Sequence, residues 1–276
     1  MRSVLAWHEL LFLVLGTGVL TALALTKGLP GLTISIACGL AAYAVLLGRT
    51  QGGDWLRLLG SYGVAWAFYA GASRVVEALG VPLRHQELLA ADAALFGQSP
   101  ALAWQGRLSA WENDGLSAAY LSYHLYLHWA LLDALWRDTS WRRQISAYLF
   151  AAFGLGFVGY LLYPAAPPYV AFPELFPEPV KGGLLTVWNQ QINTTMAARY
   201  DAFPSLHVLI TLTLLSWDWA HFRTRFWAML VPSVLMLVAT LALRLHYAVD
   251  LLASLLLFLI LLLCHARPAT RRSLGP

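Results

Sequence analysis

Two histidines far apart in the chain stand where an imidazole can do chemistry. His207 lies in the stretch FPSLH at the start of a long apolar run, and His246 lies in RLHYAVD at the start of another. Asp250 follows His246 by four residues, which is one helical turn, so both side chains are expected on one face. The carboxylate can accept the Nδ1 proton of His246 and leave Nε2 free to attack an electrophile.

The residues that begin the run around His207 predict a site for an anion. Pro204 suits the first turn of a helix. The free backbone N–H groups of Ser205, Leu206 and His207 would then bind an anion. A nucleophilic histidine, a second histidine that can protonate a leaving group and an anion-binding helix end together favour phosphoryl transfer. The alternative is that each histidine is an interfacial residue with a satisfied hydrogen bond, but the cost of a carboxylate at membrane depth weakens that reading for the set.

The elements that must position these residues are membrane helices. Of 276 residues, 59% are hydrophobic and 12% are charged, and mean hydropathy is +0.62. A soluble domain of ordinary composition carries about 25% charged residues. Nucleic acid is excluded as an expected partner, because no basic cluster is interleaved with solvent-facing aromatic residues. The composition predicts an all-α, polytopic transmembrane bundle.

Apolar runs divide the chain into about eight predicted spans. They lie near residues 4–25, 31–48, 56–75, 116–136, 144–163, 204–220, 226–244 and 247–266. The connection 82–114 predicts helices along the membrane interface between the third and fourth spans, whereas 164–203 is rich in proline and glycine. We expect two N-terminal helices in residues 1–50 and a six-helix core in 51–276, with functional segments at 163–169, 203–207 and 244–250.

Charge asymmetry predicts the orientation of this bundle. With the N-terminus in the cytoplasm, eleven of the 18 basic residues and five of the 14 acidic residues fall on the cytoplasmic side. The eleven are Arg2, Arg49, Arg57, Arg137, Arg142, Arg143, Arg223, Arg225, Arg267, Arg271 and Arg272. The prediction is a protein of the plasma or inner membrane with both termini cytoplasmic and with His207 and His246 at the extracytoplasmic face.

The paired motifs resemble those of a known family. PSLH followed by HYAVD is similar to the type-2 phosphatidic acid phosphatase superfamily, whose signature is a PS-x-H box and a later box with histidine four residues before aspartate. The branch it resembles most is the inositol phosphorylceramide synthase (aureobasidin A-resistance) type, which adds an element like Tyr163-Pro-Ala-Ala-Pro-Pro-Tyr169. The resemblance covers roughly residues 92–254. It implies that His246 forms a phosphohistidine, that Asp250 orients it, and that His207 protonates the leaving alcohol.

The chain departs from the family pattern in its first box. The lysine- and arginine-bearing element K-x6-RP is not present, and PAAPP contains no cation. Arg244, Arg199 and Lys181 are the outer-side candidates for binding phosphate. Arg244 is favoured because it lies two residues from His246, although a snorkelling interfacial arginine is the alternative.

Other residues are candidates for contact with the substrate. Ser205 and Tyr247 belong to the two boxes, and His124 and His128 lie four apart in YHLYLHW. That histidine spacing can bind a metal, but no carboxylate or cysteine is near in sequence, so lining a substrate pocket or packing in the bundle is favoured. No metal or cofactor is expected.

The resemblance implies a metal-independent enzyme that cleaves a lipid phosphoester or phosphodiester. The expected partner is a membrane lipid, whether a phospholipid, a ceramide-type lipid or a polyprenyl phosphate. The branch favours transfer of a phospho head group to a lipid or polyol hydroxyl, and a phosphatase with water as acceptor is the alternative. A transporter that uses the histidines as a proton relay is a second alternative, which the lack of internal repeats disfavours.

Overall fold

Every regular element that the structure describes is helical, which confirms the all-α prediction. The computed structural model describes residues 5–26 and 29–266. Arg2, Arg267, Arg271 and Arg272, and the first residue of the predicted span 4–25, lie outside the described residues. The elements are α1 (Trp7–Leu25), α2 (Pro30–Arg49), α3 (Trp55–Leu79), α4 (His85–Phe96), α5 (Pro100–Ala103), α6 (Ala110–Leu135), α7 (Thr139–Leu162), α8 (Pro168–Ala171), η1 (Pro173–Leu175), α9 (Leu184–Thr195), α10 (Leu206–His221), α11 (Arg223–Ala242) and α12 (Ala248–Ala266).

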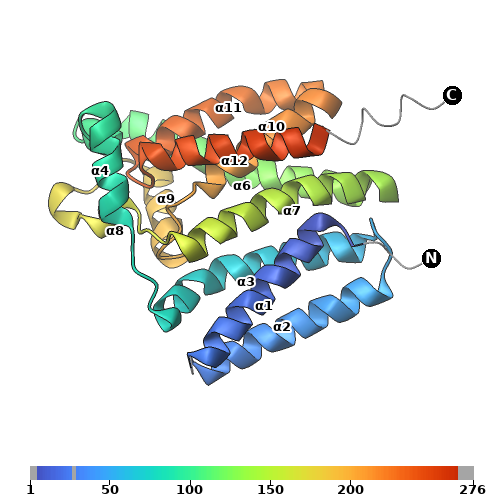
Figure 1. Ribbon diagram of the computed structural model, residues 1–276. Helices are drawn as coiled ribbons and strands as arrows, with labels where there is room; N and C mark the ends of the chain where they lie inside the picture. The colour runs from blue at the N-terminus through green and yellow to red at the C-terminus, as the bar shows by residue number, and fades with distance from the viewer. Residues whose placement is uncertain (1–4, 27–28, 267–276) are drawn as a thin grey trace.

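The long helices pack side by side around α7. Helices α1 and α3 contact one part of its surface, α10 and α12 contact another, and α11 packs on α6. Figure 1 shows α1, α2 and α3 together below α7, with α6, α10, α11 and α12 above it. Both ends of the described chain lie at one end of the bundle, and α4, α8 and α9 lie at the other.

Five helices are long and apolar enough to cross a bilayer: α1, α2, α7, α11 and residues 248–265 of α12. The other three long helices are α3, α6 and α10. Helix α10 has only 16 residues, and α6 contains three tyrosines, two histidines and three acidic residues. These polar groups lower the hydropathy of α6. The structure therefore supports a membrane protein, and eight spans stay a prediction for α3, α6 and α10.

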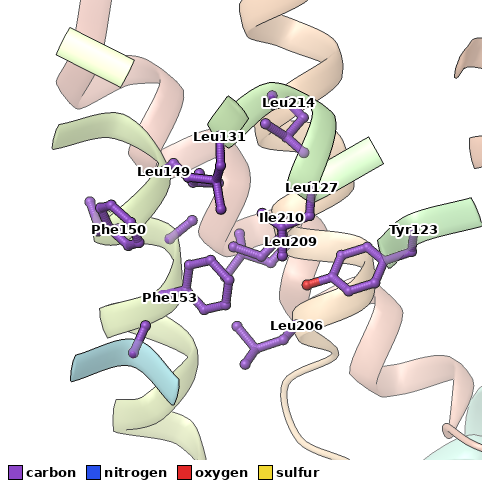
Figure 2. Close-up of a cluster of buried hydrophobic side chains, with 14 of the residues drawn as sticks. Tyr123, Leu127, Leu131, Leu149, Phe150, Phe153, Leu206, Leu209, Ile210 and Leu214 are labelled. Atoms are coloured by element: carbon purple, nitrogen blue, oxygen red, sulfur yellow. The ribbon is translucent and has the colours of Figure 1, made fainter. Parts of the chain in front are cut away.

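The hydrophobic core lies where α6, α7 and α10 meet. Figure 2 shows Phe153 of α7 facing Leu209 and Ile210 of α10, whereas Phe150 lies on the other side of α7, where its ring packs against Phe12 of α1. A further contact brings the start of α10 unusually close to the end of α7. A Cβ atom on Gly156 would collide with the Leu206 side chain, and one on Gly159 would collide with Pro204. These two glycines therefore set the position of the segment that carries His207.

The end of the bundle near the chain termini collects buried ion pairs. Arg225 binds Asp218 at 2.6 Å, and Asp218 also accepts a hydrogen bond from Tyr126 of α6 at 2.7 Å. Arg57 of α3 binds Glu9 of α1 at 3.0 Å, and both side chains are 3% exposed. Arg142 donates to the Gly53 carbonyl at 2.8 Å, which ties the first turn of α7 to the α2–α3 connection. Charged partners thus fix the helix ends on this side.

The opposite end holds the start of α12 through α4. Asp92 of α4 is fully buried and accepts hydrogen bonds from the backbone N–H groups of Ala248 (3.1 Å) and Val249 (2.9 Å) and from the Ser99 hydroxyl (2.7 Å). A carboxylate at a helix N-terminus satisfies unpaired N–H groups and interacts favourably with the helix dipole. Helices α4 and α5 occupy the connection predicted to be interfacial, and Figure 1 shows α4 running across the ends of the long helices. Their position at a membrane interface stays a prediction.

We predict that Asp92→Ala destabilises the protein more than removal of an exposed helix cap does. The substitution leaves two amides at the start of α12 without their acceptor in a fully buried place, which should cost about 2 kcal/mol or more. The measurement is the thermal unfolding midpoint in detergent. Asp138→Ala, which removes an exposed cap of α7, is the matched control and should cost about 1 kcal/mol. Equal shifts for the two variants would contradict this assignment.

The orientation predicted from the charges is tested by labelling. The segment with Glu178, between η1 and α9, and the start of α7 with Thr139 lie at opposite ends of the bundle, and both residues are exposed. In a background without Cys38 and Cys264, each is replaced singly: Glu178→Cys and Thr139→Cys. An impermeant maleimide added to intact cells should label the first variant and spare the second, because basic residues retain loops in the cytoplasm. The reverse labelling pattern would place the histidines at the cytoplasmic face.

Candidate active site

The structure brings the two sequence-distant histidines into contact. Nε2 of His246 lies 3.4 Å from Nδ1 of His207, and the ring centroids are 5.6 Å apart. His207 stands in the first turn of α10, whereas His246 lies in the turn between α11 and α12. His246 is only 3% exposed. The two boxes of the sequence therefore form one site.

The tautomer of His246 is set mainly by a backbone carbonyl. Nδ1 lies 2.9 Å from the Ala202 oxygen and 3.4 Å from Oδ2 of Asp250. Because a carbonyl oxygen can only accept, Nδ1 carries the proton and Nε2 carries a lone pair. The expected approach of Asp250 to Nδ1 of His246 is present at 3.4 Å, although α12 begins at Ala248, so the two residues do not share a regular helical turn. Oδ2 of Asp250 also accepts from the backbone N–H of Tyr247 at 2.8 Å, as part of the helix start.

His207 extends this hydrogen-bonded chain toward α6. Its Nε2 lies 2.8 Å from the Tyr120 hydroxyl, which is also 3.3 Å from Oδ1 of Asn193. Since Nε2 of His246 carries no proton, the 3.4 Å contact requires a proton on Nδ1 of His207. Nε2 of His207 then accepts from Tyr120. One continuous row of donors and acceptors runs from Tyr120 through both imidazoles to the Ala202 carbonyl.

The start of α10 differs from the prediction. The helix begins at Leu206 with Ser205 as its N-cap, so Pro204 precedes the helix instead of opening it. The Ser205 hydroxyl accepts from the Val208 N–H at 3.5 Å and is fully buried. Anion binding by the N–H groups of Ser205, Leu206 and His207 stays a prediction.

The proline-rich element forms a backbone scaffold behind the histidines. The Ala165 carbonyl accepts from the Ala202 N–H at 3.0 Å, and the Ala166 carbonyl accepts from the Tyr247 hydroxyl at 3.1 Å. This element therefore joins the loop before α10 to the turn before α12. Tyr247, a candidate for substrate contact, is fully buried in this scaffold and lies outside the wall of the cavity at the histidines.

A cavity of about 230 Å³ opens onto both histidines. Asp201, which the motifs did not indicate, lies in its wall, and its Oδ2 accepts from the Tyr69 hydroxyl at 2.7 Å. Burial raises the pKa of the Asp201 carboxyl above its usual range, and the Tyr69 hydrogen bond acts in the opposite direction. The available signal was an acidic residue two positions before FPSLH, between apolar neighbours.

The three candidate cations occupy different positions. Arg199 lines the cavity with the histidines and forms an exposed ion pair with Glu77 at 3.3 Å. Arg244 is mostly buried, donates to the Glu178 carbonyl at 2.5 Å and lies over the Phe176 ring. It lines a neighbouring cavity of about 260 Å³. Lys181 is exposed, pairs with Glu178 at 3.2 Å, and lines neither cavity.

A third, larger cavity contains the histidine pair of α6. Its volume is about 750 Å³, its walls are mainly apolar, and His124 and His128 lie in it. Both ring nitrogens of His128 already have partners, because Nδ1 lies 2.7 Å from the His124 carbonyl and Nε2 lies 2.7 Å from the Tyr62 hydroxyl. Among the described residues, no group of three or more potential ligands gathers around a metal position. His207 lies in the wall of this cavity as well as in that of the smaller one.

Comparison with known proteins gives one match. No curated protein and no solved structure matches the chain. The family model of the PAP2 superfamily matches residues 86–264, which begin in α4 and include both histidines and Asp250. This match covers well over half of the chain and confirms the superfamily part of the resemblance, while leaving out α1 to α3. Together with the paired histidines, it shows that the chain belongs to the PAP2 superfamily.

Proposed function

We propose that this protein cleaves a lipid phosphoester or phosphodiester through a covalent intermediate on Nε2 of His246. Membership of the superfamily indicates a lipid phosphoesterase of the phosphatase type, generally independent of metal. The observation that carries the proposal is the bond from Nδ1 of His246 to the Ala202 carbonyl. It leaves the lone pair of Nε2 directed at His207, in a cavity that both rings line.

The reaction uses the two imidazoles in sequence. Nε2 of His246 attacks phosphorus, a phosphorus–nitrogen bond forms, and the bond to the leaving oxygen breaks. For this step His207 carries a proton on both ring nitrogens; the positive ring donates one of them to that oxygen, so an alcohol leaves and a neutral imidazole remains. In the second half, an acceptor hydroxyl or water loses its proton to His207 and attacks phosphorus, and the phosphorus–nitrogen bond breaks. Asp250, 3.4 Å from Nδ1, stabilises the positive ring that exists between the two halves.

The phosphate charge requires positive partners that the proline element lacks. Arg199 is the cation in the wall of the histidine cavity, and its ion pair with Glu77 is exposed. Surface ion pairs contribute little stability, so the guanidinium can turn toward a bound phosphate at small cost. Bidentate binding of phosphate by a guanidinium is short and strong. Arg199 is therefore the proposed phosphate ligand next to the histidines, and Ser205 contributes through the helix start.

The neighbouring cavity favours group transfer over simple hydrolysis. It adjoins the histidine cavity through four shared residues: Tyr169, Asn193, Thr194 and Leu245. Arg244, Asn189 and Gln190 are among its polar lining residues. Amides and a guanidinium suit the recognition of hydroxyl groups. We propose that this cavity receives a polyol, which is either the head group of the donor lipid or the acceptor of the phosphoryl group. The enzyme would then be a head-group transferase like the inositol phosphorylceramide synthase branch. Hydrolysis by water is the alternative.

We predict that the two histidines respond differently to the leaving group. His246→Ala should lower turnover of every phosphate substrate at least about a thousandfold, because the covalent step is removed. His207→Ala should strongly slow the release of alcohol from alkyl phosphates but spare the first release of p-nitrophenolate, which departs without a proton, whereas the second half slows for both substrates. The measurements are the burst of p-nitrophenolate in the first turnover and steady-state kinetics with one alkyl and one p-nitrophenyl substrate. His221→Ala, at the far end of α10, is the control. Residual activity of His246→Ala within tenfold of wild type would overturn the nucleophile assignment.

The activity itself is tested with purified protein and a lipid panel. Phospholipids, ceramide phosphates and polyprenyl phosphates are incubated in detergent with EDTA, with and without ceramide, diacylglycerol or inositol as acceptors. We expect head group or phosphate release in EDTA, inhibition by vanadate, and a new phospho product when the right acceptor is present. Activity that disappears on chelation and returns with Mg²⁺ would contradict the site chemistry. Release that never depends on an acceptor would favour the phosphatase alternative.

A further inference from the structure

The large cavity is apolar and open toward the side of the bundle. Its walls come mainly from α3, α6 and α9, and Leu125, Trp188 and Met196 on its rim are strongly exposed. Asp114 of α6 fixes α9 in place, because it accepts from the N–H groups of Gly183 (2.8 Å) and Thr186 (2.9 Å). A volume of about 750 Å³ matches the size of cavities that bury small organic ligands. The walls suit hydrocarbon chains.

Away from Asn193 and His207, which lie toward the histidine pair, Tyr62, His124 and His128 form a second polar group in these mainly apolar walls. Nδ1 of His128 is bonded to the His124 carbonyl and therefore carries the proton, so Nε2 accepts the hydroxyl proton of Tyr62. The hydroxyl proton of Tyr62 is used in its bond to His128, whereas the hydroxyl oxygen keeps a lone pair that can accept a hydrogen bond. The ring nitrogens of His124 bond to no residue in the part of the chain that the structure describes. The polar group thus offers the cavity one N–H donor and two acceptors.

A bare hydrocarbon chain cannot satisfy this arrangement. A polar group that is buried against an apolar ligand without a partner loses its hydrogen bond to water and gains nothing. A carbonyl oxygen in the ligand would accept from the N–H of His124. The His124 and His207 ring centroids are 6.3 Å apart, so such a carbonyl would lie only a few bonds from a phosphorus atom held at the histidine pair.

We infer that Tyr62, His124 and His128 form a recognition site for the acyl carbonyl next to the phosphorylated end of the lipid. The inference rests on the proposed function and narrows its substrate. It selects a lipid whose tails are attached through an ester or amide, and it disfavours a polyprenyl phosphate, whose chain has no carbonyl. His124 contacts the carbonyl, while Tyr62 and His128 hold the α3 and α6 sides of the cavity together.

The test compares two substrates that differ only in the carbonyl. A diacyl phospholipid and its dialkyl ether analogue, with equal chain lengths and head groups, are assayed with wild type. The ratio of kcat/KM should favour the diacyl lipid roughly tenfold, mainly through KM. His124→Phe should bring the ratio close to one, whereas His124→Gln, which keeps a donor, should retain part of the preference. An amide-linked ceramide phosphate shows whether ester and amide are both accepted.

Two further measurements separate the possible failures. Leu132→Ala, on an exposed position of α6 outside the wall of this cavity, should leave the ratio unchanged. Thermal stabilisation by the diacyl lipid should exceed that by the ether lipid in wild type but not in His124→Phe, whether or not either lipid is turned over. The inference is overturned if wild type shows equal kcat/KM and equal thermal stabilisation with the two lipids. It is also overturned if His124→Phe lowers kcat/KM for the diacyl and the ether lipid by the same factor. Wild type that binds selectively but releases nothing would instead overturn the proposed function.

Discussion

The hydrogen bond between His246 and the Ala202 carbonyl is the contact on which the site depends. It joins the loop before α10 to the turn before α12. Its direction fixes which nitrogen holds the proton, and through the 3.4 Å contact it fixes the tautomer of His207 too. The surrounding structure holds the two segments in register. The Ala165 and Ala166 carbonyls bind one segment each, Gly159 lets α10 approach, and Asp92 secures α12.

The hydrogen bond of His246 is held in place because the helices pack through an apolar interior and carry their polar contacts at the two ends of the bundle. The interior between the ends is built from leucine and aromatic side chains that pack α6, α7 and α10 together. The ion pairs of Arg225 with Asp218 and of Arg57 with Glu9 lie at the opposite end from the histidines. Breaking a buried pair by removing one partner is strongly destabilising, because it leaves an uncompensated charge. These pairs therefore hold the helix ends in place more than they add net stability.

The sequence predicted the helical class, the approximate helix boundaries and the pairing of FPSLH with HYAVD, because hydrophobic runs and motif order are local signals. It did not predict the role of the Ala202 carbonyl, since a backbone acceptor from another segment has no residue type to reveal it. The spacing of His246 and Asp250 predicted their contact, which is present at 3.4 Å, but not its backbone, because α12 begins two residues after the histidine. Asp92 and Asp201 were missed for a related reason, since their partners lie far away along the chain. Spans at α3, α6 and α10 stay predictions; polar side chains lower the hydropathy of α6, and α10 has only 16 residues.

The shared position of His207 has a consequence for how the reaction ends. Its ring forms part of the wall of the small cavity with Asp201 and Arg199 and also part of the wall of the large apolar one. His207 shares this position with Tyr120, Asn193 and Ala197, which also line both cavities. In the proposed reaction, the bond that breaks lies next to this shared wall. When the acceptor is water or a polyol, the two products therefore leave by different routes: the lipid moiety moves sideways into the bilayer and the phosphorylated moiety moves into water.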